Sequence, residues 1–370
     1  MKIAFVGDCV IHNPDNHKIG DGLKQILNTC DVQVINFEAP VKFEGAKGIK
    51  KSGPVISQSA DTPSWLEKAG FSVISLANNH MLDLQEKGLV KTSECFKDSI
   101  LVGAGTYEDA HKAKGITLKG KSVGFIGLTH KEFGCIDCSN PDRLGTADIS
   151  SPKTYTALAE ALKIYDEVFV VAHAGVEYLD YPLPQWREMY KALIDMGASG
   201  VIGSHPHVPQ GFEVYKGKPI FYSLGNFAFQ KSHEDTIPRL WNSSILVVID
   251  TDTDGFKWWP LKYNQNSGII DIDSDNGIKS HIEKISEVLQ DDKQYKEAIL
   301  KELEALNVIY KSMATTGGLK PRKFLAKCKN LIRPLFNRKR VKPDYSHALN
   351  LFQCESHRWV MEYLLKTEKF

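Results

Sequence analysis

The stretch GVIGSHPH at residues 200–207 shows the pattern that decides the fold. Its apolar run is typical of a short buried strand, and the polar loop that follows holds His205 and His207 on either side of Pro206, whose ring restricts the backbone. The same order of apolar run and polar loop occurs at residues 3–6, 32–35, 73–76, 123–128 and 168–172. Helical patterns separate several of these runs, at residues 63–70, 86–97, 152–165 and 185–196. The alternation predicts an α/β fold with largely buried strands.

From residue 218 the pattern changes to consecutive strands, KPIFYSL, SSILVVIDTD and GFKWWPLKYN. The last two are joined through Asp-Thr-Asp-Gly, which indicates a hairpin and an antiparallel part of the sheet. After about residue 275 no strand pattern remains, and residues 281–308 have the apolar spacing of one charged helix. We therefore expect one domain over residues 1–270 and a helical extension over residues 271–370.

Charge and composition exclude several classes of protein. Lys and Arg number 46 against 45 for Asp and Glu, so the chain as a whole has no charge that favours nucleic acid or a membrane surface. The chain starts without the apolar stretch of a secretory signal, and no apolar run approaches the roughly 18 residues needed to span a bilayer. Seven scattered cysteines, including Cys135 and Cys138 without a second pair, favour free thiols. A cytoplasmic protein is expected.

One local exception to the balanced charge lies within the extension. Residues 319–342 hold ten Lys or Arg and no Asp or Glu, with apolar residues between them. This basic segment is expected either to be a solvated helix or to bind an anionic membrane surface or polyanion, which would place the protein at the membrane periphery. Specific recognition of nucleic acid is not expected.

Several side chains that bind metals follow the predicted strands. The carboxyl ends of strands in an α/β protein converge on one edge of the sheet, so these side chains should meet there. Each alone has an ordinary explanation, such as a helix cap or a solvated loop residue, but their joint occurrence favours a metal centre. Carboxylate, amide and imidazole groups together suit Mn, Zn or Fe. The set comprises Asp8, Glu38, Asn79, His80, His173, His205 and His207.

Ordered motifs over residues 1 to about 265 resemble the CapA, or poly-gamma-glutamate and capsule biosynthesis, family within the calcineurin-like metallophosphoesterases. The resemblance implies a layered metallophosphatase-like β-sandwich flanked by helices. The motifs are Gly7-Asp8, NFEAP at 36–40, LANNHMLDLQEKGL at 76–89, GAGTYEDA at 103–110, HAGVEY at 173–178 and GSHPHVPQGFEVYKGKPIFYSLGNF at 203–227.

The resemblance also implies roles for individual residues and a cofactor of one or two divalent transition metal ions. Asp8 and His207 would bind one metal, Glu38 would bridge, and Asn79, His173 and His205 would bind the second. His80 would face the leaving group as a catalytic residue and would not bind metal. Glu177 would contact substrate or orient His173, and Asn226, in the GNF segment, would contact substrate.

This chain departs from the superfamily pattern at its first motif. The usual Asp-x-His is absent because position 10 is Val10, and the bridging residue is Glu38 in place of Asp. The first metal position is therefore short of a ligand. Occupancy by a single metal and recruitment of His12 or His17 both remain open.

We therefore predict a metal-dependent hydrolase of the phosphoesterase type, linked to the synthesis of a capsule or another anionic polymer at the cell surface. Its partners would be an anionic polymer or phosphoester substrate and polymer-synthesis proteins. The alternative is a non-catalytic component that binds the polymer or a synthase. Hydrolysis of glutamyl amide linkages would use the same chemistry, and the sequence does not separate it from phosphoester cleavage.

Overall fold

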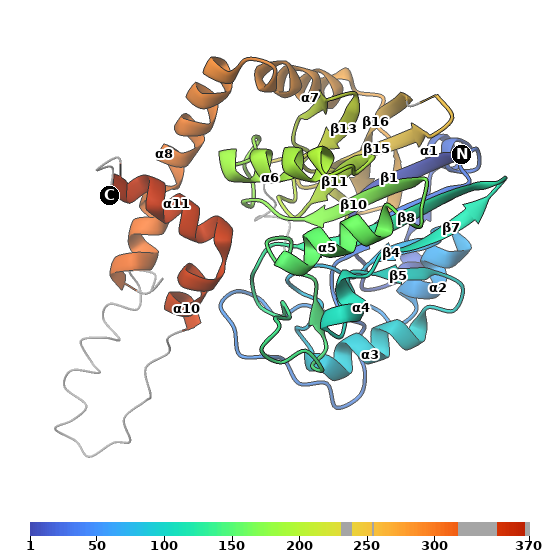
Figure 1. Cartoon of the computed structure of the whole chain (residues 1–370), viewed down its shortest axis with the longest axis horizontal. Coiled ribbons are helices and arrows are strands. Elements are labelled where there is room, and N and C mark those ends of the chain that lie inside the picture. The colour runs from blue at the N-terminus through green and yellow to red at the C-terminus, as the bar shows by residue number, and fades with distance from the viewer. Residues whose placement is uncertain (231–238, 254, 317–345, 367–370) are drawn as a thin grey trace.

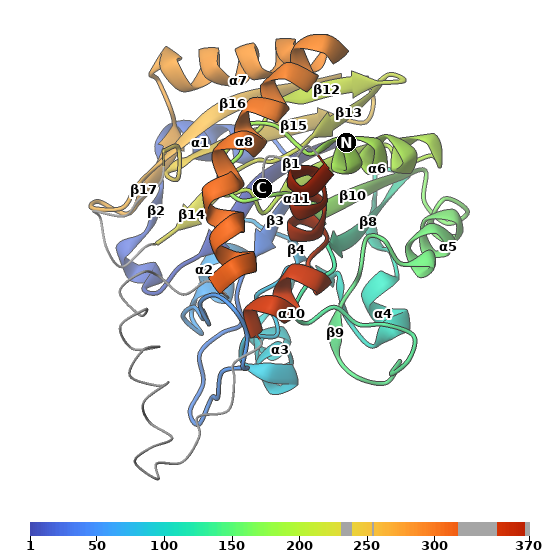
Figure 2. The same cartoon turned by 90° about the vertical axis from the view of Figure 1, so that its left-hand side faces the viewer.

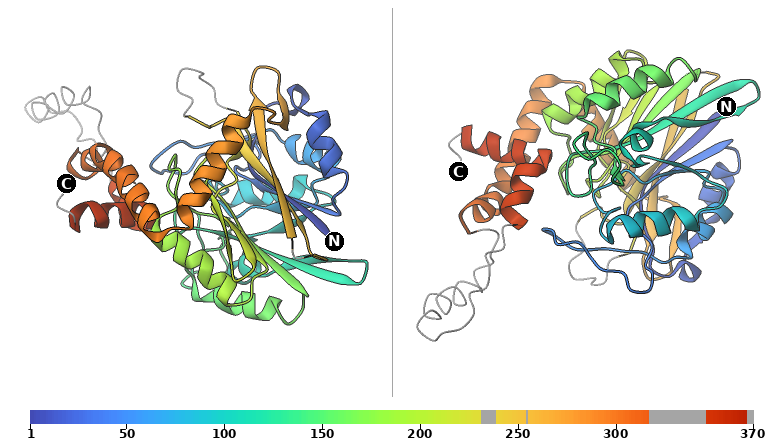
Figure 3. Two further views of the ribbon diagram at one scale, coloured as in Figure 1. Left: turned by 90° about the horizontal axis from the view of Figure 1, so that it is seen from above. Right: turned by 60° about the horizontal axis from the view of Figure 1, so that its bottom comes forward.

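Two mixed β-sheets face each other, and helices cover their outer sides (Figure 1). The structure is a computed structural model that describes residues 1–370 except 231–238, 254, 317–345 and 367–370. The predicted α/β sandwich flanked by helices, with helices at the C-terminal end, is confirmed. Figure 3 shows the two sheets from above, with the C-terminal helices to one side.

The first sheet contains nine strands within the described residues, in the order β2-β17-β16-β15-β1-β3-β4-β5, and β14 also pairs with β1. β1 is parallel to β3 and β14 and antiparallel to β15. The strands are β1 Lys2–Val10, β2 Lys18–Ile19, β3 Val32–Phe37, β4 Val73–Ser75, β5 Ile100–Val102, β14 Asn226–Phe229, β15 Ser243–Asp250, β16 Gly255–Asn264 and β17 Ile269–Ile272.

The second sheet has six described strands in the order β12-β13-β11-β10-β8-β7, with β8, β10, β11 and β13 parallel. They are β7 Lys114–Leu118, β8 Lys121–Thr129, β10 Glu167–His173, β11 Gly200–Ser204, β12 Phe212–Tyr215 and β13 Lys218–Phe221. A small antiparallel pair joins β6 Ala104–Gly105 to β9 Gly145–Thr146.

The sequence suggested that the consecutive strands after residue 218 form one antiparallel unit, but not all of them do. β15, β16 and β17 are antiparallel neighbours, and the predicted hairpin is confirmed. β13, however, lies parallel to β11 in the second sheet, whereas β14 lies parallel to β1 in the first. The chain therefore passes from one sheet to the other between residues 221 and 226, which brings the end of β14 beside the end of β1.

Alternating side chains on the strands build the core. On β1, Ile3 and Phe5 point between the sheets and Ala4 and Val6 point toward the outer helices. The ring of Phe5 lies 5.5 Å from that of Phe169 in the facing sheet. This alternation follows from the two-residue period of a strand and explains why both faces of β1 are apolar.

Helices cover both outer faces. The helices α1 Asp21–Leu27, α2 Thr62–Lys68 and α3 Gln85–Cys95 pack on the first sheet. The helices α4 Tyr107–His111, α5 Pro152–Ala161 and α6 Pro184–Asp195 pack on the second. A short 3-10 turn, η1 Pro14–Asn16, follows β1.

The C-terminal extension is helical, but residues 281–308 do not form one helix. The helices are α7 Asn276–Leu289, α8 Asp292–Thr316, α10 Ser346–Gln353 and α11 Glu355–Lys366 (Figure 2). α7 ends because Asp291 caps the next helix, where its Oδ1 accepts hydrogen bonds from the backbone N–H groups of Lys293 and Gln294, at 2.8 and 3.0 Å.

The C-terminal extension packs against the side of the second sheet that α6 covers. Leu289, Tyr295, Leu303 and Val360 belong to the same apolar cluster as α6. The domain division at residue 270 therefore stays a prediction, since this cluster contains residues from both sides of it. The basic segment 319–342 lies outside the described residues. No helix in the described part of the chain is both long enough and apolar enough to span a membrane.

Candidate metal centre

Six of the predicted ligand residues lie together where strands of both sheets end. Asp8 is near the end of β1, Glu38 follows β3, His173 ends β10, and two histidines follow β11. Their ligand atoms form two overlapping groups, each within 4.8 Å, which share Glu38. One group is Asp8, Glu38 and His207, and the other is Glu38, His173 and His205. We call these five residues and Asn79 the candidate metal centre.

Asp8 is held as a charged carboxylate. Its Oδ1 accepts a hydrogen bond from Asn36 Nδ2 at 2.7 Å, and its Oδ2 accepts one from the backbone N–H of His205 at 3.0 Å. Burial by itself would raise the pKa of Asp8, but the neighbouring His173 and His207 and the bond from Asn36 outweigh it and lower the pKa to about 2. The backbone bond also ties β1 to the loop after β11.

Glu38 is a buried carboxylate that lacks compensation from the protein. Neither of its oxygens has a hydrogen-bond partner among the described residues. His173 Nε2 and His207 Nε2 lie 3.6 and 3.7 Å from Oε1, beyond hydrogen-bond distance. Burial, and then the charge of Asp8, raise the pKa of Glu38 well above 4.5. Because an unpaired buried charge is costly, a divalent cation between these groups fits the residues present.

Two of the histidines, His173 and His205, favour the neutral form that a metal ligand requires. Burial lowers the pKa of His173 to about 4, although Asp8 opposes the shift. Burial and the neighbouring His130 lower the pKa of His205 well below 6.5. His173 Nε2 lies 3.1 Å from Asn79 Oδ1 and 3.1 Å from His205 Nδ1, so the three side chains converge on one point.

The loop after β11 has a strained backbone. His205 has φ 99° and His207 has φ 60°, in the region that residues other than glycine and asparagine rarely adopt. Each such conformation costs about 1–3 kcal/mol and persists only where the surrounding structure imposes it. Such strain is concentrated at functional sites, and here it aims both imidazoles toward Glu38.

His80 lies beside the centre but outside both ligand groups. Its Nδ1 lies 2.7 Å from Asp83 Oδ2, at hydrogen-bond distance. Lys51 pairs with the other oxygen of Asp83 and its Nζ lies 3.0 Å from the same ring nitrogen. With Nδ1 occupied by Asp83, Nε2 is the nitrogen available to another molecule.

The two residues expected to bind substrate differ in their surroundings. Glu177 is exposed, and its charge contributes to raising the pKa of Glu38, so it lies near the centre. Asn226 is fully buried, with Oδ1 3.0 Å from His207 Nδ1 and Nδ2 donating to the carbonyl of Trp241 at 3.0 Å. Both the oxygen and the nitrogen of the Asn226 side chain have partners within the protein. This geometry favours a role in orienting His207 over a role in contacting substrate.

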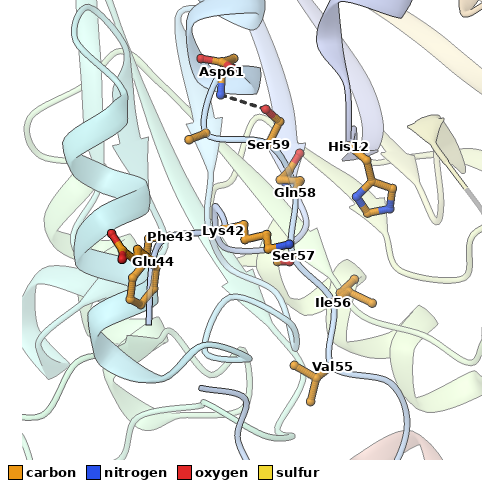
Figure 4. Close-up of a pocket in the computed structure, with 11 residues that line it drawn as sticks. His12, Lys42, Phe43, Glu44, Val55, Ile56, Ser57, Gln58, Ser59 and Asp61 are labelled. Atoms are coloured by element: carbon orange, nitrogen blue, oxygen red, sulfur yellow. Dashed lines mark hydrogen bonds between the residues drawn. The ribbon is translucent and has the colours of Figure 1, made fainter. Parts of the chain in front are cut away.

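Neither histidine considered as a replacement for the missing ligand joins the centre. His17 lies 2.7 Å from the Tyr263 hydroxyl through Nε2 and 2.8 Å from the carbonyl of Asn13 through Nδ1. His12 lines a pocket of about 860 Å³ together with Lys42, Gln58 and Asp61 (Figure 4). The lining contains no member of the candidate metal centre, although Gln58 Nε2 donates to the carbonyls of Cys9 and Ala39, next to Asp8 and Glu38.

The sequence pattern missed several polar residues around the centre. Asn36 donates to Asp8, and Asn78 Nδ2 donates to the carbonyl of Phe37 at 2.9 Å, which fixes the turn before Glu38. His130 directly follows β8, and its ring centroid lies 4.4 Å from that of His205. Its place just beyond a strand end is the same signal that identified His173, so the sequence could have indicated it.

The facing sheets, and the carboxylates, amide and neutral imidazoles gathered at their strand ends, define an α/β protein with a candidate binuclear metal centre. Residues 2–231 match the family model described as bacterial capsule synthesis protein PGA_cap, and the chain belongs to this family. The resemblance inferred from the motifs is thereby confirmed.

Individual relatives carry related names. The chain is 38% identical over 221 residues to the capsule biosynthesis protein CapA of Bacillus anthracis, covering 55% of this chain and 52% of that protein. It is 31% identical over 250 residues to the PGA biosynthesis protein CapA of Bacillus subtilis, covering 62% of this chain and 64% of that protein. The chain thus matches between half and two thirds of the length of these relatives.

A solved structure of a 5'-nucleotidase from Candida albicans is similar with a TM-score of 0.41 at 12% identity, covering 80% of this chain and 58% of that chain. A likeness at this level does not bear on the activity.

Proposed function

We propose that this chain is a metal-dependent hydrolase of the phosphoesterase type that acts in the synthesis of a capsule or another anionic polymer at the cell surface. The observation that carries the proposal concerns Glu38, which belongs to both groups of ligands. Its two carboxylate oxygens are buried and have no hydrogen-bond partner among the described residues. Membership of the capsule synthesis family supports the process.

The ligand assignment follows the two groups. Asp8, Glu38 and His207 would hold one ion, and Glu38, His173 and His205, with Asn79, would hold the other. The mixture of oxygen and nitrogen donors suits Mn, Zn or Fe better than Mg or Ca. Bound divalent ions would lower the pKa of water at the centre and offset negative charge on a phosphoryl oxygen.

Other side chains would handle the substrate. His80 would meet the leaving oxygen through Nε2, because Asp83 holds Nδ1 and fixes the ring. Protonation of a leaving group by a positioned histidine contributes about 10²–10⁴ in rate. Glu177, exposed beside the centre, would contact substrate, and Asn226 would keep Nε2 of His207 directed at Glu38.

The experiment is elemental analysis of the purified chain, followed by assays on phosphomonoesters and phosphodiesters with manganese or zinc restored. We expect one or two ions per chain at this centre, and turnover that requires them. Less than about 0.2 ion per chain after reconstitution would contradict a metal centre of this kind, whose carboxylate and imidazole ligands should bind the ion tightly.

A second candidate is a non-catalytic component that binds the polymer or a synthase through the same fold. The names of the relatives favour it, since they refer to a process and not to a reaction. Full metal loading without turnover on phosphoesters or on glutamyl amides, together with binding of the anionic polymer, would support this candidate. Amide hydrolysis would be distinguished by release of glutamate from the polymer.

The expected location is the cytoplasm, with contact at the membrane through residues 319–342. The described cysteines are free, which suits a reducing compartment. Polymer-synthesis proteins are the expected partners.

A further inference from the structure

A second group of metal-binding side chains lies outside the candidate metal centre. His130 and Glu132 belong to the loop after β8, and Cys354 lies between α10 and α11. Their ligand atoms all fall within 4.8 Å of one another. His130 and Cys354 are buried, and the Glu132 side chain is 11% exposed.

The spacing is close to that of a tetrahedral metal site. His130 Nε2 lies 3.1 Å from Glu132 Oε2 and 4.0 Å from Cys354 Sγ. With zinc bonds of about 2.0–2.1 Å to nitrogen and oxygen and about 2.3 Å to sulfur, tetrahedral angles place these pairs about 3.4 and about 3.6 Å apart. Both observed distances lie within about 0.4 Å of these values, so small side-chain movements would complete the geometry.

The surroundings also favour a cation. The nearly buried Glu132 carboxylate meets His130, whose ring stacks on Trp186 at 5.9 Å. A carboxylate, an imidazole and a thiol held together away from water can compensate one another through a shared ion. The sulfur ligand favours zinc, cobalt or iron over magnesium or calcium.

We propose that His130, Glu132 and Cys354 form a separate site for a zinc-like divalent ion, which joins the C-terminal extension to the sheet domain. The ligands His130 and Cys354 are 224 positions apart in the chain. Three protein ligands leave one tetrahedral position for water. The site does not rest on the proposed hydrolase activity.

Neighbouring contacts show what this ion would hold in place. The backbone N–H of Lys131 donates to Glu355 Oε2 at 3.1 Å, and Trp186 Nε1 donates to Ser356 Oγ at 3.1 Å. Ser356 in turn donates to the carbonyl of Gly175, two residues after His173. The start of α11 is therefore docked against the segment that carries part of the candidate metal centre.

Cobalt substitution of the full chain tests the proposal, because a thiolate bound to Co²⁺ gives an intense charge-transfer absorption in the near ultraviolet. The candidate metal centre has no sulfur ligand and cannot produce this band. We expect the band in the unaltered chain, its loss in Cys354→Ser, and one fewer ion per chain in that variant. Altering a residue that only hydrogen-bonds to a metal ligand weakens metal binding about 10–100-fold. Loss of a residue that binds the metal directly should weaken it at least as much.

Two further variants complete the test. Cys135→Ser is the matched control, since its thiol bonds to the His130 carbonyl at 3.3 Å but lies outside the ligand group, and it should keep the band. Glu132→Gln retains the thiol and should shift the band and weaken cobalt binding, even if Cys354→Ser fails to fold. A fully cobalt-loaded chain without the band, or an unchanged band in folded Cys354→Ser, would overturn the proposal.

Discussion

Replacement of Glu38 by glutamine should change stability in opposite directions with and without metal. Without metal, both carboxylate oxygens are buried and lack partners among the described residues, and ligand atoms of Glu38 and Asp8 lie within 4.8 Å. Two unit charges at that distance repel by about 3.5 kcal/mol at an effective dielectric constant of about 20. Partial protonation relieves some of this repulsion, so we expect Glu38→Gln to gain about 1–3 kcal/mol in chelator.

With metal present the expected effect is reversed. A ligand at 100 times its Kd stabilises a protein by about 2.7 kcal/mol, and a 100-fold loss of affinity reduces this to about 0.4 kcal/mol. Glutamine supplies no negative charge to either ligand group, so Glu38→Gln should lose most of the metal-induced rise in Tm. The gain in chelator corresponds to a rise of roughly 2–6 °C.

Thermal unfolding in chelator and in excess manganese or zinc, with elemental analysis of the same samples, measures both effects. Glu213→Gln is the matched control, because Glu213 is also buried but accepts bonds from Arg187 Nη2 at 2.9 Å and from the Tyr222 hydroxyl. It should be destabilised equally in both conditions. The reasoning would be refuted if Glu38→Gln lowered the Tm in chelator and kept normal metal content in excess metal.

Three other predictions address the site, the extension and the basic segment. His205→Ala should lower metal content and turnover together. His80→Ala should keep its metal content and lose about 10²–10⁴ in turnover, with a smaller loss for substrates that have good leaving groups. Loss of metal in His80→Ala would show that His80 is a ligand. Burial, and then Asp180, raise the pKa of Glu302 from 4.5 to about 7, so its contribution to stability is present below pH 4.5 and lost as pH rises through about 7. The loss amounts to at most about 3 kcal/mol. The pH dependence of the free energy of unfolding should flatten across this range in Glu302→Gln, and an unchanged slope would argue against the partial burial of the Glu302 side chain. Deletion of residues 319–342 should weaken co-sedimentation with anionic liposomes at low salt but not with neutral ones, and equal co-sedimentation would exclude the basic segment as the membrane contact.

Local patterns in the sequence sufficed to predict the elements that build the candidate metal centre. The apolar runs before Glu38, Asn79, His173 and His205 are strands, two in each sheet, and the polar residues after them meet because the ends of the two sheets lie together at this site. What the pattern could not supply was the placement of β14. Its pairing with β1 sets Asn226 beside Asp8, and this register depends on contacts over more than 200 positions. The role of Asn226 toward His207 was therefore not predictable from its own neighbourhood.

The same limit applies with greater force to Cys354. In the sequence it is one of several scattered cysteines within a helical extension, and neither spacing nor composition relates it to His130. The docking of α11, through Ser356 on Trp186 and through Glu355 on the backbone of Lys131, brings its sulfur to the loop after β8. Because that docking also reaches the segment following His173, an ion held by Cys354 would stabilise the position of the extension beside the candidate metal centre.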